Sequence, residues 1–327
     1  MLRSARLGNE HFRHFDIRQA TAITFGGQLV IRFAEQEINK VMNALLDTNG
    51  KDYVIASDTD SLYLKFAGAA EKLLAVNPAL TQEQLVEKLD KIAEKKIIPA
   101  FDEIFNRLSQ MLGAQQGTLV MKREAIANRG IWTAKKRYML NVFDNEGIRY
   151  DTPKIKIMGI EAVKSSTPSS CRKAIKDAIG VIMSGTERDL QEFIKKYRQE
   201  FQSLPFEDIA FPRAVNQVTK YLNLEKGVPI HTKGAVIYNR LRKELKLEKK
   251  YEEIRNGEKI KFCYLKEPNP IMSHVISAIA FLPEEFGLRP YIDYSMQFDK
   301  AFIEPLNAIL KVIGWHPEPN QTLESFF

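Results

Sequence analysis

The chain has 327 residues, of which 44% are hydrophobic and 27% charged, a composition typical of globular proteins with a buried core. The formal net charge is +7, and no apolar run approaches the roughly 18 residues that a membrane span needs. The basic N-terminus has no apolar stretch behind it, so we expect no signal peptide and a protein of the cytoplasm.

The first predicted elements are a helix and a hairpin. Apolar residues at near-helical spacing predict a helix over residues 20–48, and Gly50 is the expected left-handed stop. Two β-prone runs, residues 53–56 and 61–66, flank a short polar insert. Such a pattern favours a β-hairpin.

A second helix is predicted over residues 81–112. Thr81 and Gln84 have the spacing of a capping box, which marks the start of a helix. Pro99 lies inside this helix and should kink or break it, because proline has no backbone N–H to donate.

Beyond these helices the pattern becomes strand-like up to about residue 160. We expect strands at 118–121 and 137–143, and a turn at 144–147 that leads into a strand at 148–150. Residues 169–184 and 186–203 then read as helices, the second capped by Thr186 and Asp189. The overall expectation is an α+β protein.

A pair of carboxylates lies at the tip of the predicted hairpin, in Asp58-Thr59-Asp60-Ser61. At a spacing of two in extended chain, the two side chains share a face, and adjacent carboxylates favour a divalent cation between them. Oxygen ligands suit Mg²⁺, and paired metal ions serve phosphoryl transfer. Taken alone, two aspartates in a turn are more often turn formers.

A basic stretch lies farther along the chain. Residues 118–176 contain 13 Lys/Arg and 5 Asp/Glu, so the whole positive excess of the protein lies there. This distribution favours a surface that binds a polyanion, although a solvated basic face has the same composition. Cys171 and Cys263 are far apart without metal-ligand spacing, so we expect reduced thiols.

Several motifs occur together in a fixed order along the chain. They are Leu7-Gly8-Asn9, Ala20-Thr21-Ala22-Ile23-Thr24, Asp58-Thr59-Asp60-Ser61 between two apolar runs, Lys122-Arg123-Glu124, Lys135-Lys136-Arg137-Tyr138, Lys164-Ser165-Ser166-Thr167 and His231-Thr232-Lys233-Gly234. In this order they resemble the C-terminal palm-and-thumb part of a family B DNA polymerase of the T-even bacteriophage type, closely over about residues 5–175 and more loosely beyond.

The resemblance implies an antiparallel β palm with packed helices over 1–160, a mainly helical thumb over 161–315 and a C-terminal tail over 316–327. The implied activity is template-directed nucleotidyl transfer from a deoxynucleoside triphosphate to a primer 3′ end. The implied setting is the cytoplasm of an infected bacterial host.

The resemblance also assigns roles in catalysis. Asp60 is implied as the ligand of two Mg²⁺ ions, Asp58 as its partner, and Thr59 as a neighbour of the primer end. Glu124 faces the same site in the family; its alternative is an ion pair with Lys122 or Arg123. This chain departs from the family by having Ala56-Ser57 where Tyr-Gly usually precedes the first aspartate, which puts contacts with the primer end there in doubt.

Contacts with DNA are implied for the basic motifs. Cations bind phosphates of any sequence with a strong dependence on salt. The implied residues are Lys135, Lys136, Arg137, Tyr138, Lys164, Ser165, Ser166, Thr167, His231 and Lys233. For His231 a structural role is the alternative.

The last residues, 316–327, form a polar leader with a hydrophobic end. Leu323, Phe326 and Phe327 are spaced to share one face of a short helix. The pattern resembles the sliding-clamp-binding peptide at polymerase C-termini; a tail docked on its own thumb is the alternative.

Other parts of a family B polymerase find no counterpart in these residues: the second palm carboxylate, the nucleotide-binding fingers and the exonuclease. We therefore expect an N-terminal partner chain that supplies them, with this chain inactive alone. Two other functions stay open. One is a non-catalytic DNA-binding and clamp-tethering subunit, and the other is a metal-dependent nuclease using Asp58, Asp60 and Glu124.

Overall fold

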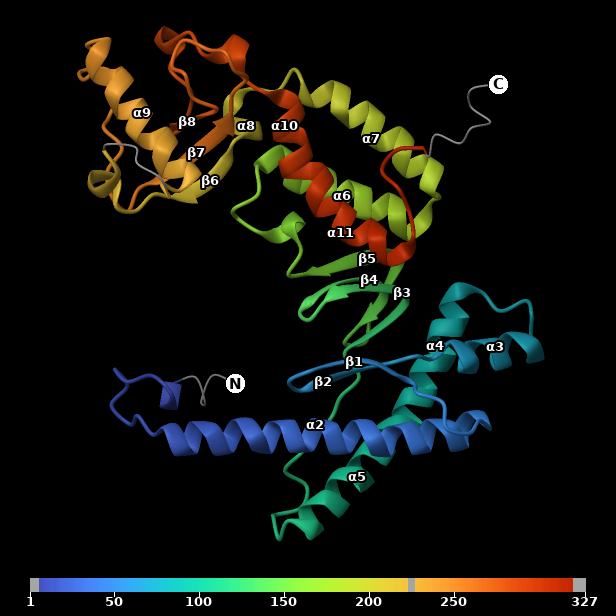
Figure 1. The fold of residues 1–327 in the computed structure, drawn as a ribbon. Coiled ribbons are helices and arrows are strands. Elements are labelled where there is room, and N and C mark those ends of the chain that lie inside the picture. Colours follow the sequence, from blue (N-terminus) through green and yellow to red (C-terminus); the bar gives the residue numbers. More distant parts are fainter. Residues whose placement is uncertain (1–5, 223–226, 320–327) are drawn as a thin grey trace. The chain divides into compact units, whose positions relative to one another are not determined.

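A computed structural model describes residues 6–222 and 227–319 (Figure 1). Helices and antiparallel sheets occur together, which confirms the predicted α+β class. The chain forms two compact units, which are described separately. Unit 1 comprises residues 1–128 and 142–154, and unit 2 comprises residues 129–141 and 155–327. The division into a palm and a thumb near residue 160 stays a prediction.

Unit 1 contains two long helical stretches and a hairpin. Its elements up to residue 111 are α2 (Ile17–Leu46), β1 (Val54–Asp58), β2 (Ser61–Leu64), α3 (Ala67–Val76), α4 (Gln82–Ile92), the π-helical segment η1 (Ala93–Ile97) and α5 (Ile98–Met111). The second half of α2 packs against α5. Ile38, Met42, Phe101 and Phe105 are buried in the core of this unit.

The predicted helix over 20–48 is confirmed as α2, with different ends. Asp16 caps its start, because the side chain accepts hydrogen bonds from the backbone N–H groups of Arg18 and Gln19. The prediction that Gly50 ends the helix is wrong. Asp47 adopts the left-handed conformation at the C-cap, and a short acidic side chain tolerates that conformation better than most residues do.

The predicted helix over 81–112 is confirmed, including its capping box and its interruption. Thr81 and Gln84 cap each other at the start of α4. The α-helical pattern gives way to η1 just before Pro99, which occupies the first turn of α5. Proline is tolerated there because the first N–H groups of a helix have no intrahelical partner.

Two features of unit 1 depart from the expectations. Helix α3 was not predicted. The strand expected at 118–121 is absent, because these residues form no ladder with another strand. Leu119 and Met121 instead pack as extended chain against the core of this unit. Leu119, Val120 and Met121 are consecutive apolar residues, and such a short run does not determine whether a partner strand is present.

The strands β3 (Ala125–Ala134), β4 (Arg137–Asn145) and β5 (Ile148–Met158) form one sheet in the order β3-β4-β5. The expected strands at 137–143 and 148–150 are confirmed, and both extend farther. The turn between them requires its glycine, because Gly147 has φ +86°.

Unit 2 is built around helix α6. Its elements are η2 (Glu161–Val163), α6 (Ser169–Ser184), α7 (Glu187–Phe201), α8 (Phe206–Ile209), β6 (Phe211–Ala214), η3 (Val218–Tyr221), α9 (Ile230–Glu244), β7 (Lys259–Tyr264), β8 (Val275–Ala278), η4 (Glu284–Phe286), η5 (Arg289–Tyr291), α10 (Tyr294–Phe298), η6 (Asp299–Ile303) and α11 (Glu304–Ile313). Both predicted helices, 169–184 and 186–203, are confirmed as α6 and α7, including the Thr186–Asp189 capping box.

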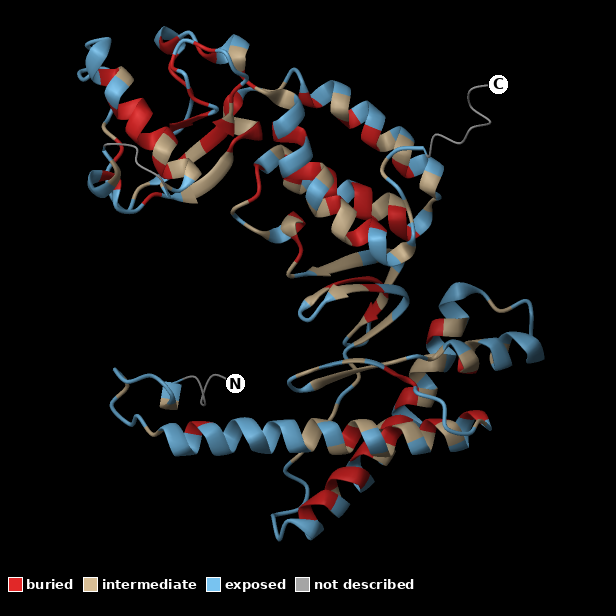
Figure 2. Cartoon of the chain, viewed as in Figure 1, coloured by how far each residue is buried: buried red, intermediate tan, exposed pale blue. Residues whose placement is uncertain are grey.

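The core of unit 2 lies between these helices and a second sheet. Ile175, Ile179 and Ile182 of α6 are fully buried and recur at helical spacing, as Figure 2 shows by the red stripe along this helix. Strands β6, β7 and β8 pair in antiparallel order, and α9 covers β8. Helix α9 approaches so closely that a Cβ on Gly234 would lie 2.4 Å from Ser277 Oγ.

Candidate catalytic turn and nucleic-acid interface

The Asp58-Thr59-Asp60 segment forms a tight turn at the tip of the β1–β2 hairpin. The backbone N–H of Asp60 donates to the carbonyl of Asp58 at 2.6 Å, across a single residue. Thr59 between them has φ +58°, and its hydroxyl donates to Asp58 Oδ1 at 3.1 Å. A three-residue turn with positive φ at its centre is rare and strained, above all for a β-branched residue.

This geometry corrects one step of the sequence argument. Asp58 ends β1 and pairs with Ser61, so Asp60 belongs to the turn rather than to an extended strand. The rule that alternate residues share a face therefore does not apply to this pair. The Asp60 side chain is exposed and has no hydrogen-bond or ion-pair partner within residues 6–222 and 227–319.

The base of the hairpin is fixed to α2 by two asparagines one turn apart. Asn39 Oδ1 accepts the backbone N–H of Tyr53 at 2.8 Å. Asn43 accepts the N–H of Lys51 at 3.0 Å and donates to the carbonyl of the same residue at 2.7 Å. Tyr53 itself is buried and shares a 2.8 Å hydrogen bond with the Thr48 hydroxyl. These contacts orient the strand that ends in Asp58.

Glu124 is exposed just before β3, and its carbonyl accepts the N–H of Glu146 at 2.6 Å. Of its two expected alternative partners, Lys122 and Arg123, the second contacts Asp90 and the fully buried Asp144. Among the described residues, no three acidic, histidine or cysteine side chains gather closely enough to bind a metal ion. Within them, the turn therefore offers two carboxylates without a third from Glu124.

The basic motif occupies the turn between β3 and β4 in unit 2. Lys135 and Lys136 are exposed at the turn, and Lys136 has φ +60°. Tyr138 is buried and stacks on Trp132, with ring centroids 6.2 Å apart and an angle of 29° between the ring planes. The aromatic pair anchors a turn whose two lysines face solvent.

Gly159 supports this turn from the next segment of the chain. Its φ is +66°, and a Cβ at this position would lie 2.1 Å from the backbone oxygen of Lys136. No other residue type fits such an approach. The turn that contains Lys135 and Lys136, which we call the lysine turn, is therefore held against the chain that leads into η2.

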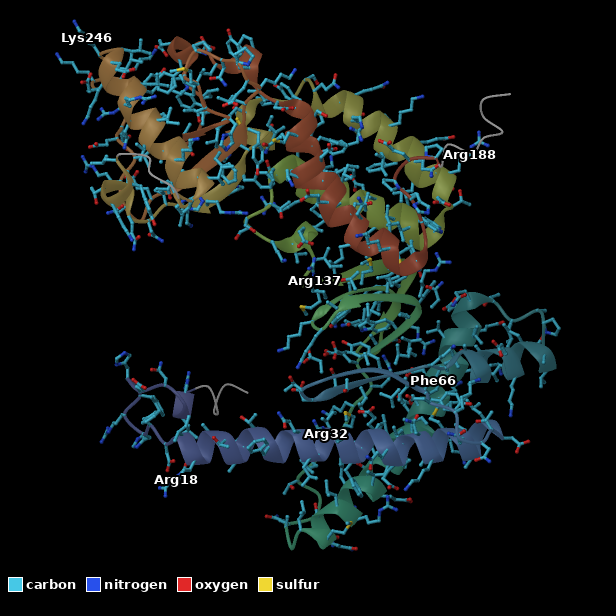
Figure 3. All side chains as sticks on the ribbon, viewed as in Figure 1. Arg18, Arg32, Phe66, Arg137, Arg188 and Lys246 are labelled. Atoms are coloured by element: carbon cyan, nitrogen blue, oxygen red, sulfur yellow. The ribbon has the colours of Figure 1, made fainter. Side chains whose placement is uncertain are left out.

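Glu161, two residues later, binds two of the predicted cations at once. Its Oε2 accepts from Arg137 Nη2 at 2.6 Å, and its Oε1 accepts from Lys164 Nζ at 2.9 Å. Arg137 lies at the start of β4 (Figure 3). Burial works to raise the pKa of Glu161, but the hydrogen bond from Lys164 and the charge of Arg137 outweigh it and lower the pKa.

The segment that follows, residues 164–167, is fixed by Arg213 of β6. Arg213 Nη1 donates to the carbonyl of Ser166 at 2.8 Å. Ser165 is exposed, whereas Thr167 is buried and its backbone N–H donates to the carbonyl of Lys164 at 3.2 Å. Arg213 also helps to lower the pKa of His231, although burial of the imidazole is the larger cause.

His231 and Lys233 lie in the first turn of α9 and are both partly exposed. The carbonyl of His231 accepts from the Ser277 hydroxyl at 2.9 Å, and its ring contacts Phe262. The close approach at Gly234 fixes this end of the helix on β8. His231 thus has a packing role, and its contact with DNA stays a prediction.

Three further cations lie on α6 beside η2. Arg172, Lys173 and Lys176 line a shallow depression of about 380 Å³, with Ala162, Val163 and Ser169. No ion pair joins these three cations to another described residue. Sequence reasoning counted them only as part of the basic stretch.

The structure therefore brings together residues that are separated in sequence. The lysine turn, Lys164, Ser166 and His231 are connected within unit 2 through Gly159, Glu161 and Arg213. We refer to the cations and neighbouring polar residues of this part of unit 2 as the basic surface: Lys135, Lys136, Arg137, Lys164, Ser165, Ser166 and His231. Glu161 and Arg213 were missed, because an acidic residue in a basic stretch and a distant arginine carry no motif. The connecting role of Gly159 was missed too, although a glycine directly after the strand-like residues 154–158 is a signal for a close approach.

The start of the tail lies against α7. The N–H of His316 donates to Glu187 at 2.6 Å, and Arg198 contacts Glu318 at 3.0 Å. The predicted clamp-binding residues Leu323, Phe326 and Phe327 lie outside the described residues. Within the described ranges, no helix is long and apolar enough to cross a membrane.

Comparison with known proteins identifies relatives among phage enzymes, although no family model matches. The chain is 33% identical over 338 residues to the DNA-directed DNA polymerase of Enterobacteria phage T4 and 34% identical over 340 residues to that of Escherichia phage RB69. Each alignment covers 98% of this chain and 37% of the relative. The chain is therefore related along nearly its whole length to the T-even phage DNA polymerases. The match is consistent with a C-terminal part of such a polymerase.

Proposed function

We propose that this chain supplies one catalytic carboxylate and the primer–template grip of a DNA-directed DNA polymerase. The observation that carries the proposal is that one chain, similar to phage polymerases, contains both a strained Asp58–Asp60 turn and a basic surface whose residues are held in place. The reaction would be template-directed transfer of a nucleotide from a deoxynucleoside triphosphate to a primer 3′ end. The chain spans about a third of the length of its relatives, so the remaining parts of the active site would come from elsewhere.

The carboxylate turn fits a divalent metal in the chemistry of its donors. Carboxylate oxygens suit Mg²⁺, which commonly takes one or two of them and completes its shell with water and substrate phosphates. Asp60 would hold the metal and Asp58 would assist, with Thr59 near the primer end. A pair of such ions supplies charge stabilisation to both the attacking and the leaving oxygens in phosphoryl transfer. The rest of the ligand set would come from a carboxylate outside these 327 residues.

The basic surface fits the phosphate backbone of a duplex. Lys135, Lys136 and Ser165 are exposed, and the partly exposed Lys164 lies close by. Contacts of this kind read no base sequence and depend strongly on salt, as a polymerase acting on any template requires. Arg172, Lys173 and Lys176 on α6 would extend the same phosphate-binding surface.

The first half of α2 fits a surface that another polypeptide covers. Ile17, Phe25 and Leu29 are 58%, 62% and 46% exposed, and Figure 2 shows this half of the helix mostly in pale blue. Gly26 and Gly27 in between have no atom within 4 Å of an added Cβ. Two glycines inside a helix weaken it. We assign this face to the fingers and remaining palm, on a separate N-terminal chain that also carries the exonuclease in the arrangement favoured by the sequence.

The test is primer extension in a reconstituted mixture. The chain, the complementary polymerase portion, primed template, deoxynucleoside triphosphates and Mg²⁺ are combined, with wild type, Asp60→Ala or Asp102→Ala. Asp102 is an exposed acid on α5, so its loss changes the net charge equally. We expect extension with wild type and Asp102→Ala, and a loss of about a thousandfold or more with Asp60→Ala.

Two outcomes would support other functions. Extension that persists in Asp60→Ala would contradict a catalytic carboxylate and favour a DNA-binding subunit that tethers the enzyme to the sliding clamp. Degradation of DNA by this chain alone, abolished by Asp60→Ala, would favour a metal-dependent nuclease. Clamp binding through residues 323–327 is tested by pull-down with and without those five residues.

A further inference from the structure

One acidic side chain lies among the cations of the basic surface. Glu161 accepts from Arg137 through one carboxylate oxygen and from Lys164 through the other, at 2.6 and 2.9 Å. Two oxygens that bind two neighbouring cations present the same chemistry as the oxygens of a phosphodiester. The three side chains together carry one positive charge, because one of the two cationic charges is cancelled.

The two cations are more accessible than the acid that they share. The side chains of Arg137 and Lys164 are 33% and 42% exposed, whereas that of Glu161 is 21% exposed. Arg137 uses Nη2 for Glu161, and Lys164 offers three N–H donors. Partly exposed ion pairs are individually weak. A phosphate approaching from solvent therefore meets donors that Glu161 holds only loosely.

The η2 helix that contains Glu161 is closed by backbone–backbone hydrogen bonds. The N–H of Val163 donates to the carbonyl of Ile160, and the N–H of Lys164 donates to that of Glu161, which closes the short η2 helix. Gly159 holds the lysine turn by its close approach to Lys136. Loss of the charge at Glu161 should therefore leave the surface in place.

We propose that Glu161 competes with DNA phosphates for Arg137 and Lys164 and so weakens the grip of the basic surface on the duplex. This inference rests on the proposed function, because it gives the surface its ligand. A polymerase must exchange its phosphate contacts with the duplex at each step along the template. A carboxylate within the grip shortens each bound state without altering the shape of the surface.

The test is binding of a hairpin primer–template to the full chain, followed by fluorescence anisotropy between 50 and 300 mM NaCl. Glu161→Gln keeps the size and hydrogen-bonding oxygen of the side chain and removes its charge. We expect affinity to rise about fivefold at 100 mM salt. The plot of log affinity against log salt should steepen by about one, as one additional phosphate contact predicts.

The matched control is Glu192→Gln. Glu192 pairs with Arg188 on α7, so the variant changes the net charge equally and also releases an arginine. It should leave both affinity and salt slope unchanged. In the Lys164→Gln background, where one of the two cations is absent, Glu161→Gln should give a smaller gain.

Affinity that falls or stays constant in Glu161→Gln, with the thermal unfolding midpoint retained, would overturn the inference and make Glu161 a positioning residue. An equal gain in Glu192→Gln would overturn it too, by reducing the effect to net charge. The proposed function would fail separately, if the wild-type chain bound the primer–template without dependence on salt.

Discussion

The two turns that carry the candidate chemistry differ in what surrounds them. Both place a residue other than glycine in the left-handed region, Thr59 in one and Lys136 in the other. The lysine turn is fixed by the Trp132–Tyr138 stack and by the close approach of Gly159. Within the described residues, the carboxylate turn has an exposed Asp60 and lacks a third metal-ligating group.

The difference is consistent with the proposed division of function within the molecule. A phosphate-binding surface needs several cations held in place, and unit 2 provides them with its own residues. A metal-dependent active site needs further carboxylates at short distance, and unit 1 offers two. We therefore expect the chain to bind DNA by itself and to need other parts of the polymerase for catalysis.

The largest effect on stability is expected from Gly159, the residue that fixes the lysine turn. Gly159→Ala places a Cβ against the Lys136 carbonyl and in a left-handed backbone, which should cost about 3 kcal/mol of stability. Chemical denaturation of the full chain measures the change. Gly287→Ala is the matched control, because Gly287 has φ +62° with no atom within 4 Å of an added Cβ. Equal losses in both variants would show that the close approach contributes nothing.

The lysine turn should also determine the affinity for DNA. Exchange of Lys135 and Lys136 for glutamine removes two phosphate contacts, so affinity at 100 mM salt should fall about tenfold and the salt slope should decrease by about two. Fluorescence anisotropy with a primer–template measures both quantities. The same exchange at Lys195 and Lys196, exposed on α7, should have little effect. Similar losses from the two pairs would contradict a localised surface.

The carboxylate turn should respond differently to removal of its strain. Thr59→Gly relieves the positive φ and should stabilise the chain by about 1 kcal/mol. Ser61→Gly, at the start of β2, should destabilise it, because glycine in a strand loses more entropy on folding. Denaturation midpoints compare the two variants. Destabilisation by Thr59→Gly would show that the turn is not strained.

The smallest effect concerns pH. Burial and the charge of Arg213 lower the pKa of His231 in the folded chain. The folded state therefore prefers the neutral imidazole, and the unfolded chain takes up the proton first as pH falls. Stability from this group is present above the unfolded pKa of about 6.5 and decreases below it. His231→Gln should flatten the dependence of the unfolding midpoint between pH 7 and 5.5; an unchanged dependence would assign it to other groups.

The sequence predicted the elements with strong periodicity and clear caps. Helices α2, α4, α6 and α7 and the β1–β2 hairpin follow from apolar spacing and from capping residues such as Thr81 and Thr186. The strand expected at 118–121 was wrong because a short apolar run does not by itself determine a strand, while strand pairing depends on a partner segment elsewhere in the chain. Helix α3 was missed because Ala69 is the single buried residue along it, so the helix has only a weak apolar stripe.

The candidate site was predicted in its parts and missed in its connections. The order of the motifs identified the Asp58–Asp60 turn and the lysine turn. Glu161 and Arg213 connect parts of unit 2 that are separated along the chain, up to 47 residues for Arg213 and Ser166. Such long-range pairs leave no local pattern. The strained geometry at Thr59 was also inaccessible, because its residue type disfavours the conformation that it adopts.

The most direct test of this division is a titration of the chain with the complementary polymerase portion, in which DNA binding and primer extension are measured on the same samples. We predict that the chain alone binds the primer–template in a salt-dependent manner without extending it, and that extension rises with the added portion. Extension by the chain alone, or DNA binding that appears only with the added portion, would contradict it.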